Sequence, residues 1–207
     1  MIIHHLFEKV QEMSRALWES GNLRSPVHLC GGNEVQLMNL FMVMGKDDWI
    51  FSTHRSHYHF VIACKLRGLT DDETMARLES HIRNGNSIAI QDPEVKFRSS
   101  AILAGCCPIA VGLGMAWKRD KHNAMDRIWV FIGDGASDNG NFFEAAQYAF
   151  SQKLNIKFVI ENNNYSVGTL YEDRWGTVDR PEYPKNVEQY RYYRTVPHVG
   201  TGKHITF

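Results

Sequence analysis

The stretch IWVFIGDGASDNGNFFEAAQYAFSQKLNIKFVIENNN, residues 128–164, decides the fold. It contains two short apolar runs, at 128–132 and 156–160, joined by a segment whose aromatic and alanine residues recur at helical spacing. Each apolar run predicts a buried strand. Because parallel strands need a crossover connection, and a helix usually supplies it, the stretch predicts a strand–helix–strand unit of a parallel sheet.

Polar residues follow both predicted strands. Gly133, Asp134 and Gly135 come directly after the first strand, and residues 161–164, Glu-Asn-Asn-Asn, come after the second. The carboxyl ends of parallel strands meet at one edge of a sheet, and open α/β sheets bind their ligands at that edge. We therefore expect the two polar clusters to lie side by side in a binding site.

The residue types in these clusters suit magnesium and a diphosphate. Mg²⁺ takes about six oxygen ligands, usually from one or two protein groups, phosphates and water. Asp134 offers a carboxylate oxygen, Asn163 an amide oxygen and Tyr165 a main-chain carbonyl. Gly135 lets the backbone approach a phosphate, and a helix expected from about residue 139 points its free N–H groups toward an anion.

These residues resemble the thiamine diphosphate motif, in which Gly-Asp-Gly is followed at this distance by Asn-Asn. The longer stretch 133–169 resembles the α subunit of the decarboxylating component of 2-oxo acid dehydrogenase complexes. HLCGGNE at 28–34, THRSH at 53–57 and AILAGCCP at 101–108 are similar to other segments of that family. The resemblance implies an α/β fold, the thiamin diphosphate-binding fold: a three-layer parallel sheet with helices on both faces.

The resemblance also implies roles for single residues. Asp134, Asn163 and the Tyr165 carbonyl would bind the metal. The cofactor-binding set would be His54, Arg55, Leu103, Gly133, Gly135, Ala136 and Asn163. His57 would line the reaction channel and act in catalysis. His54 stands where the family usually has a tyrosine that binds the diphosphate, and it can still donate a hydrogen bond.

In the resembling family, a second chain or domain holds the pyrimidine of the cofactor and supplies the glutamate that activates it. The resemblance therefore implies a β-type partner subunit, a heterotetramer and a small-molecule 2-oxo acid or ketose substrate. The main hypothesis is a thiamine diphosphate- and Mg²⁺-binding subunit of an enzyme that decarboxylates a 2-oxo acid and transfers the acyl unit, inactive without its partner.

Two alternatives stay open at this point. One is a subunit of a split transketolase-like or acyloin-forming carboligase that transfers a two-carbon unit to an aldehyde or sugar. The family's C-terminal segments have no counterpart before Phe207, and this shortened end favours the carboligase. The other is a non-catalytic subunit that stabilises an assembly.

Composition sets further limits. With 207 residues, 43% of them hydrophobic, the chain is long enough for one sizeable core. Lys and Arg together number 23, as do Asp and Glu, so no net charge favours nucleic acid or a membrane surface. The four cysteines show no CxxC spacing and the N-terminus shows no signal peptide pattern, which predicts a reduced, cytoplasmic protein. His54, His57 and His59 alternate beside an arginine, which is not a zinc pattern.

We expect the rest of the chain to form mainly helices around this unit. Helical spacing predicts helices over 1–20, 34–44, 57–66, from Asp71 onward, and 99–118, with a strand or turn at 49–52. Residues 85–98 are expected to form a loop. We predict a cofactor-binding domain over residues 1–175, followed by an extended arm over 176–207, rich in tyrosine and interrupted by proline, that contacts a partner subunit.

Overall fold

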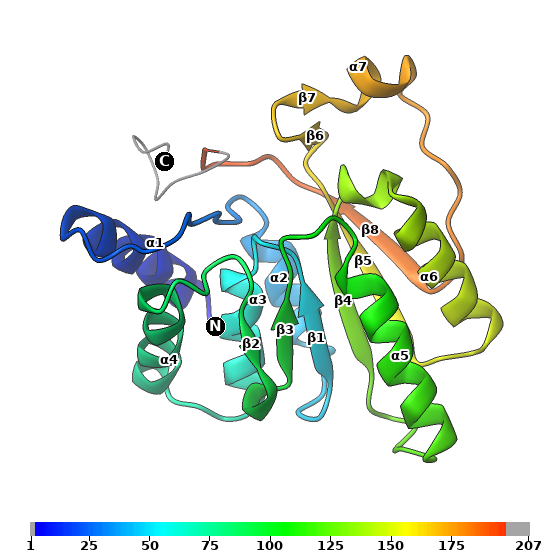
Figure 1. The fold of residues 1–207 in the computed structure, drawn as a ribbon, viewed down its shortest axis with the longest axis horizontal. Helices are drawn as coiled ribbons and strands as arrows, with labels where there is room; N and C mark the ends of the chain where they lie inside the picture. The colour runs from blue at the N-terminus through cyan, green and yellow to red at the C-terminus, as the bar shows by residue number, and fades with distance from the viewer. Residues whose placement is uncertain (1–2, 198–207) are drawn as a thin grey trace.

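The computed structural model describes residues 3–197, and its centre is a six-stranded sheet of order β2-β3-β1-β4-β5-β8 (Figure 1). The pairings of β3 with β1, β1 with β4, β4 with β5 and β5 with β8 are parallel, and β2 pairs antiparallel at one edge. The strands are β1 (Trp49–Ser52), β2 (Gln91–Asp92), β3 (Phe97–Ser99), β4 (Ile128–Gly133), β5 (Ile156–Asn162) and β8 (Val187–Arg191). A separate antiparallel pair joins β6 (Tyr165–Ser166) and β7 (Thr169–Leu170).

Helices cover both faces of the sheet. The α-helices are α1 (His4–Glu19), α2 (Glu34–Phe41), α3 (His57–Leu66), α4 (Asp71–Arg83), α5 (Cys106–Arg119), α6 (Gly140–Ser151) and α7 (Tyr171–Trp175). Two short 3₁₀ helices, η1 (Pro93–Val95) and η2 (Ala136–Asp138), complete the set in residues 3–197.

Two hydrophobic cores lie on opposite sides of the sheet. Trp129 and Phe131 of β4 belong to the core formed with α1, α2, α3 and α4. Ile128, Val130 and Ile132 of the same strand belong to the core formed with α5 and α6. Successive side chains of a strand point to opposite faces, so a strand that is apolar at every position requires cover on both. The predicted three-layer α/β fold is confirmed.

Helix α6, which connects β4 to β5, begins where the sequence predicted. The Asn139 side chain accepts a hydrogen bond from the Asn141 N–H at 2.9 Å and so caps the first turn. Phe142, Ala146 and Ala149 of α6 are buried against the sheet. The α6 N-terminus is thereby held at the carboxyl edge of β4.

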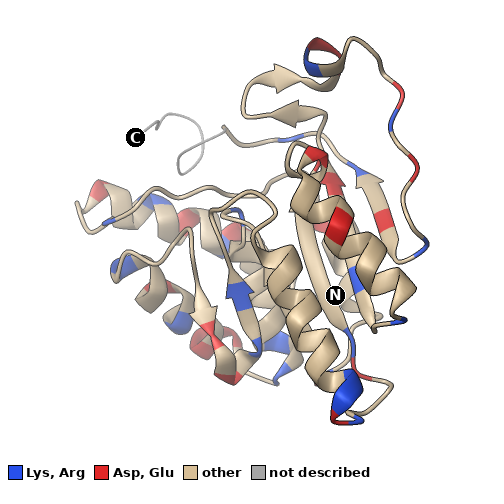
Figure 2. Ribbon diagram, turned by 45° about the vertical axis from the view of Figure 1, so that its right-hand side comes forward, with Lys and Arg blue, Asp and Glu red and all other residues tan. Residues whose placement is uncertain are grey.

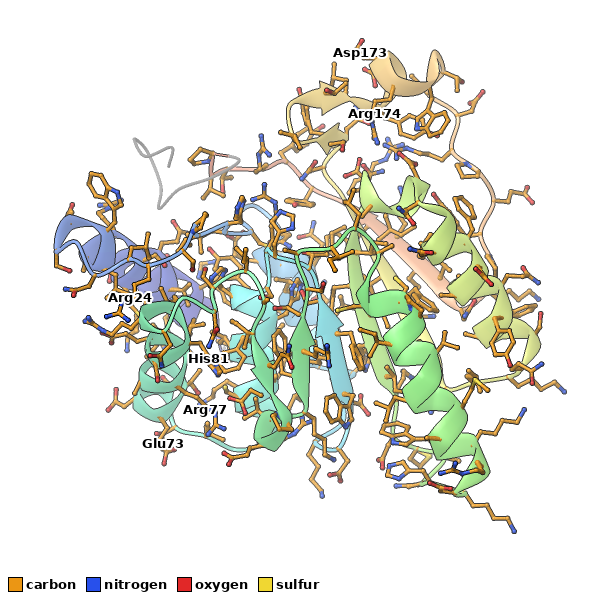
Figure 3. All side chains as sticks on the ribbon, viewed as in Figure 1. Arg24, Glu73, Arg77, His81, Asp173 and Arg174 are labelled. Carbon is orange, nitrogen blue, oxygen red and sulfur yellow. The ribbon has the colours of Figure 1, made fainter. Side chains whose placement is uncertain are left out.

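The expectation of a loop over residues 85–98 is wrong. Residues 91–92 form β2 and residues 97–99 form β3, which lies inside the sheet beside β1. Strands of two and three residues are too short to show a period-2 pattern, and β3 joins the sheet by pairing with the distant β1. Arg77 and His81 of α4 reach toward this part of the sheet (Figure 3), and both donate to Asp92 of β2, at 2.6 and 3.0 Å.

The segment expected to be an extended arm contributes a strand. Residues 187–191 form β8 and pair in parallel with β5, so Phe158 lies opposite Val187 and Asn162 opposite Arg191. The fold therefore continues past residue 175, because main-chain hydrogen bonds to the edge of β5 order this part of the segment. Residues 198–207 of the predicted arm lie outside the described residues, and its contact with a partner subunit stays a prediction.

Charged residues of both signs are interspersed over the helices and loops (Figure 2), in line with equal numbers of acidic and basic residues. Within residues 3–197, no helix has the length and hydrophobicity needed to cross a membrane. The cysteines at 30, 64, 106 and 107 are free and buried, and the cytoplasmic location stays a prediction.

The packing of α6 gives a first testable prediction. Phe142 is fully buried, whereas Phe150 on the same helix is 44% exposed. We expect Phe142→Ala to lower the free energy of unfolding by about 3–5 kcal/mol, because it removes buried ring contacts and leaves a cavity. We expect Phe150→Ala, the control, to cost less than about 1 kcal/mol. Urea unfolding followed by circular dichroism measures both, and equal losses would contradict the packing described.

Candidate functional site

A pocket lies at the carboxyl ends of β1, β3, β4 and β5. Its lining comes from the loops that follow these four strands and from the segment after β8. The residues are Thr53, His54, Arg55, Ser100, Ala101, Ile102, Leu103, Ala104, Gly133, Asp134, Gly135, Ala136, Glu161, Asn163, Tyr165, Ser166, Val167, Tyr192 and Arg194. The structure thus brings together every predicted cofactor and metal residue, and among the predicted site residues only His57 lies outside the lining.

The register of β4 and β5 positions the centre of the site. Gly133 lies opposite Glu161, so the next residues, Asp134 and Asn162, lie side by side at this edge of the sheet. Beyond Asp134 the chain turns at once into η2, where the Ser137 hydroxyl donates to the Asp134 carbonyl at 2.8 Å. The two clusters, which 25 residues separate in the sequence, therefore form one site, as predicted.

Asp134 is a buried carboxylate whose cation is an arginine. Its side chain is 2% exposed, and Arg180 Nη2 lies 3.4 Å from Asp134 Oδ2. The same nitrogen donates to the side-chain oxygens of Asn162 at 3.4 Å and Asn164 at 3.0 Å. Burial raises the pKa of Asp134 above its ordinary value, and Arg180 opposes that shift.

Asn163 and Tyr165 form a tight turn beside Asp134. The Asn163 side-chain oxygen accepts the Tyr165 N–H at 2.9 Å, and its amide nitrogen donates to the Tyr192 hydroxyl at 3.0 Å. Tyr192 is buried and follows directly after β8. Its side chain fixes the rotamer of Asn163, so the amide oxygen stays on the side of the turn.

Gly135 is required by a close approach of the chain. A Cβ atom at this position would lie 2.5 Å from Ser166 Oγ and 2.6 Å from Ser166 Cβ. At Gly133, in contrast, a Cβ would meet no atom within 4 Å. Only glycine at 135 lets η2 and the β6 segment pack together at the pocket wall.

Arg55, His54 and Leu103 lie on the opposite wall. Arg55 Nη1 donates to the Leu29 carbonyl at 3.0 Å, and burial lowers the pKa of its guanidinium. The His54 ring stands edge-on to that of His28, with 4.7 Å between ring centroids. Leu103 is 58% exposed, in the loop before α5, and presents an apolar surface to the pocket.

His57 lies away from this pocket. Its ring is fully buried in the first turn of α3 and shares a hydrogen bond with Ser87 at 2.9 Å. Burial lowers the pKa of His57 to about 4. The ring does not line the pocket, which differs from the predicted position in a reaction channel, and its catalytic role stays a prediction. A signal of burial was present in the sequence, since residues 60–64 of α3 are all apolar.

A buried polar cluster lies directly behind the pocket. Ligand atoms of Cys30, His59 and Glu161 all lie within 4.8 Å of one another. Glu161 Oε1 accepts hydrogen bonds from His59 Nε2 at 3.1 Å, from Asn33 at 2.9 Å and from the Tyr190 hydroxyl. The Cys30 thiol donates to the Arg55 carbonyl, and burial raises its pKa well above the ordinary value. These donors satisfy the carboxylate without a metal.

Sequence reasoning missed four residues of the site and its surroundings: Arg180, Glu161, Tyr192 and Arg194. Glu161 precedes the Asn run and was quoted with it, but its burial depends on distant donors. Residues 191–194 carry two arginines and two tyrosines, a composition that signals a binding segment. No local signal marks Arg180, because the contact is made by the return of the chain after α7.

The chain is similar to known dehydrogenase components along most of its length. The family model described as "Dehydrogenase E1 component" matches residues 4–180. Pyruvate dehydrogenase E1 component subunit alpha of Rickettsia bellii is 30% identical over 167 residues, which cover 79% of this chain and 50% of the relative. The mitochondrial subunit of Dictyostelium discoideum is 29% identical and is covered to 43%, and that of Porphyra purpurea is 27% identical and is covered to 54%.

The chain thus spans about half the length of the curated relatives it matches. A solved structure from Mycobacterium smegmatis, of a candidate thiamin diphosphate-dependent enzyme, covers 67% of this chain and 22% of its own, with 17% identity and a TM-score of 0.41. That likeness is too weak to carry an argument.

The close approach at Gly135 predicts a specific loss of stability. We expect Gly135→Ala to lower the free energy of unfolding by about 1–3 kcal/mol, because the new methyl group overlaps Ser166. Gly133→Ala is the matched control and should change stability by less than about 1 kcal/mol. Adding Ser166→Gly to Gly135→Ala should recover part of the loss. Urea unfolding measures all three, and no recovery would contradict the overlap.

The buried His57 predicts a pH dependence of stability. Its folded-state pKa of about 4 lies below the ordinary 6.5, so below pH 6.5 the unfolded chain binds the extra proton and the folded chain does not. Stability is therefore lost as pH falls from 6.5 to 4, by about 3 kcal/mol for this group. We expect His57→Gln to reduce, by about this amount, the loss of unfolding free energy between pH 7.5 and pH 4.5. An unchanged slope would show that His57 titrates normally.

Proposed function

Because the chain belongs to the dehydrogenase E1 component family, we propose that it is the thiamine diphosphate- and Mg²⁺-binding part of an α-type subunit of a 2-oxo acid dehydrogenase. The observation that carries this proposal is the pocket itself: nine residues chosen for that cofactor line one cavity at the carboxyl edge of the sheet. The named relatives are pyruvate dehydrogenase α subunits, which supports a 2-oxo acid as the substrate class.

The donor atoms at the β4 and β5 ends suit a magnesium ion. Asp134 supplies a buried carboxylate, and Asn163 supplies an amide oxygen held in place by Tyr192. With the Tyr165 carbonyl these are hard oxygen donors of the kind that Mg²⁺ prefers. The described residues leave the remaining ligand positions to phosphate oxygens and water.

The diphosphate fits between two walls. Gly135 and Ala136 offer main-chain N–H groups at the start of η2, and Arg55 offers a cation from the other wall. Leu103 and the exposed Ile102 beside it present apolar surface to an aromatic ring. When bound, thiamine diphosphate supplies a carbanion that attacks the 2-oxo carbon and then accepts the electrons of the broken bond.

This chain supplies half of such a site. Its residues would hold the diphosphate and the metal, and a β-type partner would hold the pyrimidine and supply the activating glutamate. We propose a heteromer of α- and β-type chains, assembled as a heterotetramer, that lacks turnover without the partner. The relatives favour this function over a carboligase and over a non-catalytic assembly subunit.

Cofactor binding tests the proposal. We expect isothermal titration calorimetry to detect thiamine diphosphate binding that depends on Mg²⁺ and that Asp134→Ala abolishes, because the variant loses the anionic metal ligand. Asp138→Asn is the matched control: Asp138 lies four residues further on and pairs with Arg174 outside the pocket lining. It should leave the affinity within about threefold of the wild type. Equal binding by wild type and Asp134→Ala would contradict the assigned metal site.

A further inference from the structure

A guanidinium occupies the position beside the proposed metal ligand. Arg180 Nη2 lies within 3.0–3.4 Å of three side-chain oxygens, from Asp134, Asn162 and Asn164. Its Cζ atom lies 3.4 Å from the centroid of the Tyr171 ring. The Arg180 side chain is only 12% exposed. This arrangement resembles a cation surrounded by oxygen ligands, with one face closed by an aromatic ring.

The contact between Arg180 and Asp134 is longer than a strong, two-nitrogen ion pair. Charge-assisted N–H···O bonds are usually about 2.7–2.9 Å long, and arginine often binds a carboxylate with two nitrogens. Arg180 reaches Asp134 with one nitrogen at 3.4 Å. Arg77, by comparison, binds Asp92 with two nitrogens at 2.6 and 2.7 Å. Arg180 therefore neutralises Asp134 without the geometry that would hold it there.

Arg180 is carried by a segment that lies outside the sheet. It lies between α7 and β8, in a stretch without helix or strand. Figure 1 shows this stretch leaving the end of α7 above the sheet and descending along the outer side of α6 to β8. The ion pair of Arg174 with Asp138 holds α7 (Arg174 is labelled in Figure 3), and the Tyr171 hydroxyl of α7 donates to the Asp179 carbonyl at 3.0 Å. The main chain beside Arg180 is therefore held, and a displacement of Arg180 from Asp134 needs a movement of its side chain only.

We propose that Arg180 is a displaceable internal cation of the metal site: it neutralises Asp134 when no metal is bound, and a divalent ion must expel it to bind. A divalent ion on Asp134 and a guanidinium a few ångströms away repel each other, so the two compete. Arg180 thereby sets the affinity of the site for the metal. The inference rests on the proposed function, since it takes Asp134 as a metal ligand.

Mn²⁺ alone, without thiamine diphosphate, is the probe. We expect Arg180→Gln to bind Mn²⁺ about tenfold more tightly than the wild type at pH 7.5, because the competing charge is gone. Arg180→Lys keeps a positive charge, so its affinity for Mn²⁺ should equal that of the wild type or lie between those of the wild type and Arg180→Gln. Arg174→Gln is the matched control, because it removes a nearby arginine charge and loosens α7, to which the Arg180 segment is attached, but leaves Arg180 on Asp134. Electron paramagnetic resonance of free Mn²⁺ measures all four proteins.

The outcomes separate the inference from the proposed function. Tighter binding in Arg180→Gln, lost again when Asp134→Ala is added, supports both. Equal or weaker binding in Arg180→Gln overturns the inference, and the proposed metal site stands if Asp134→Ala still abolishes binding. Binding by none of the proteins, or binding that ignores Asp134→Ala, overturns both. Tighter binding in Arg174→Gln to the same degree also overturns the inference, because a loosened segment would then explain it.

A second measurement uses only the wild-type protein, so it does not depend on whether a variant folds. Phenylglyoxal modifies accessible guanidinium groups, and mass spectrometry reads the rate at each arginine. We expect saturating Mn²⁺ to raise the rate at Arg180 and to leave the rate at Arg174 unchanged, since Arg174 pairs with Asp138 and not with Asp134. An unchanged rate at Arg180 with the metal bound would overturn the proposal.

Discussion

The buried carboxylate of Glu161 joins the parts of the molecule that build the site. One of its oxygens accepts hydrogen bonds from Asn33, before α2, from His59 in α3 and from Tyr190 in β8. A carboxylate buried in this way would be costly unless it were fully hydrogen-bonded. Removing one donor leaves an uncompensated polar group, so each of these distant segments depends on the others.

Because Glu161 lies at the end of β5, the hydrogen bonds that hold it also fix the wall of the pocket. Glu161 lies opposite Gly133 in the β4–β5 register, one residue before the Asn run. When Glu161 is fixed, the chain leaves β5 at a defined point, and Tyr192 beyond β8 reaches Asn163. The predicted ligands therefore stand on strand ends and short turns rather than on long mobile side chains. Such placement keeps the donors in position before a ligand arrives.

The sequence predicted what depends on local pattern. The two apolar runs and the polar clusters after them gave β4, α6, β5 and the sheet edge, because a strand buried on both faces and a capped helix leave strong local signals. It missed β3 and β8, whose short segments become strands by pairing with distant ones. It did not show where the His57 ring lies, since whether α3 turns that ring to the pocket or to the core depends on the packing of other helices.

Arg180 shows why one part of the site lay beyond sequence reasoning. The spacing of Asp134 and Asn163 along the chain, each after a predicted strand, indicated that they share a site, and β4 and β5 fix their positions. Arg180 arrives from a segment whose path is fixed by contacts of α7 and by β8, and nothing near it in the sequence indicates a cation. Yet burial of Asp134 requires one, because an isolated buried carboxylate would lose its charge.

Asp134 must be neutralised while it is buried, and under the proposed function it must also stay available to a metal. These two requirements explain the geometry that the structure adopts. Asn163 and Tyr165 are already held by Tyr192 and by each other, so they need little rearrangement to accept the proposed metal. Asp134 cannot be held as firmly by its cation, since a short two-nitrogen pair would compete too well with any ligand. A single long contact neutralises the carboxylate and leaves it available. Most of the reorganisation that the proposed metal binding would need is thereby confined to one side chain, whose supporting segment lies outside the sheet.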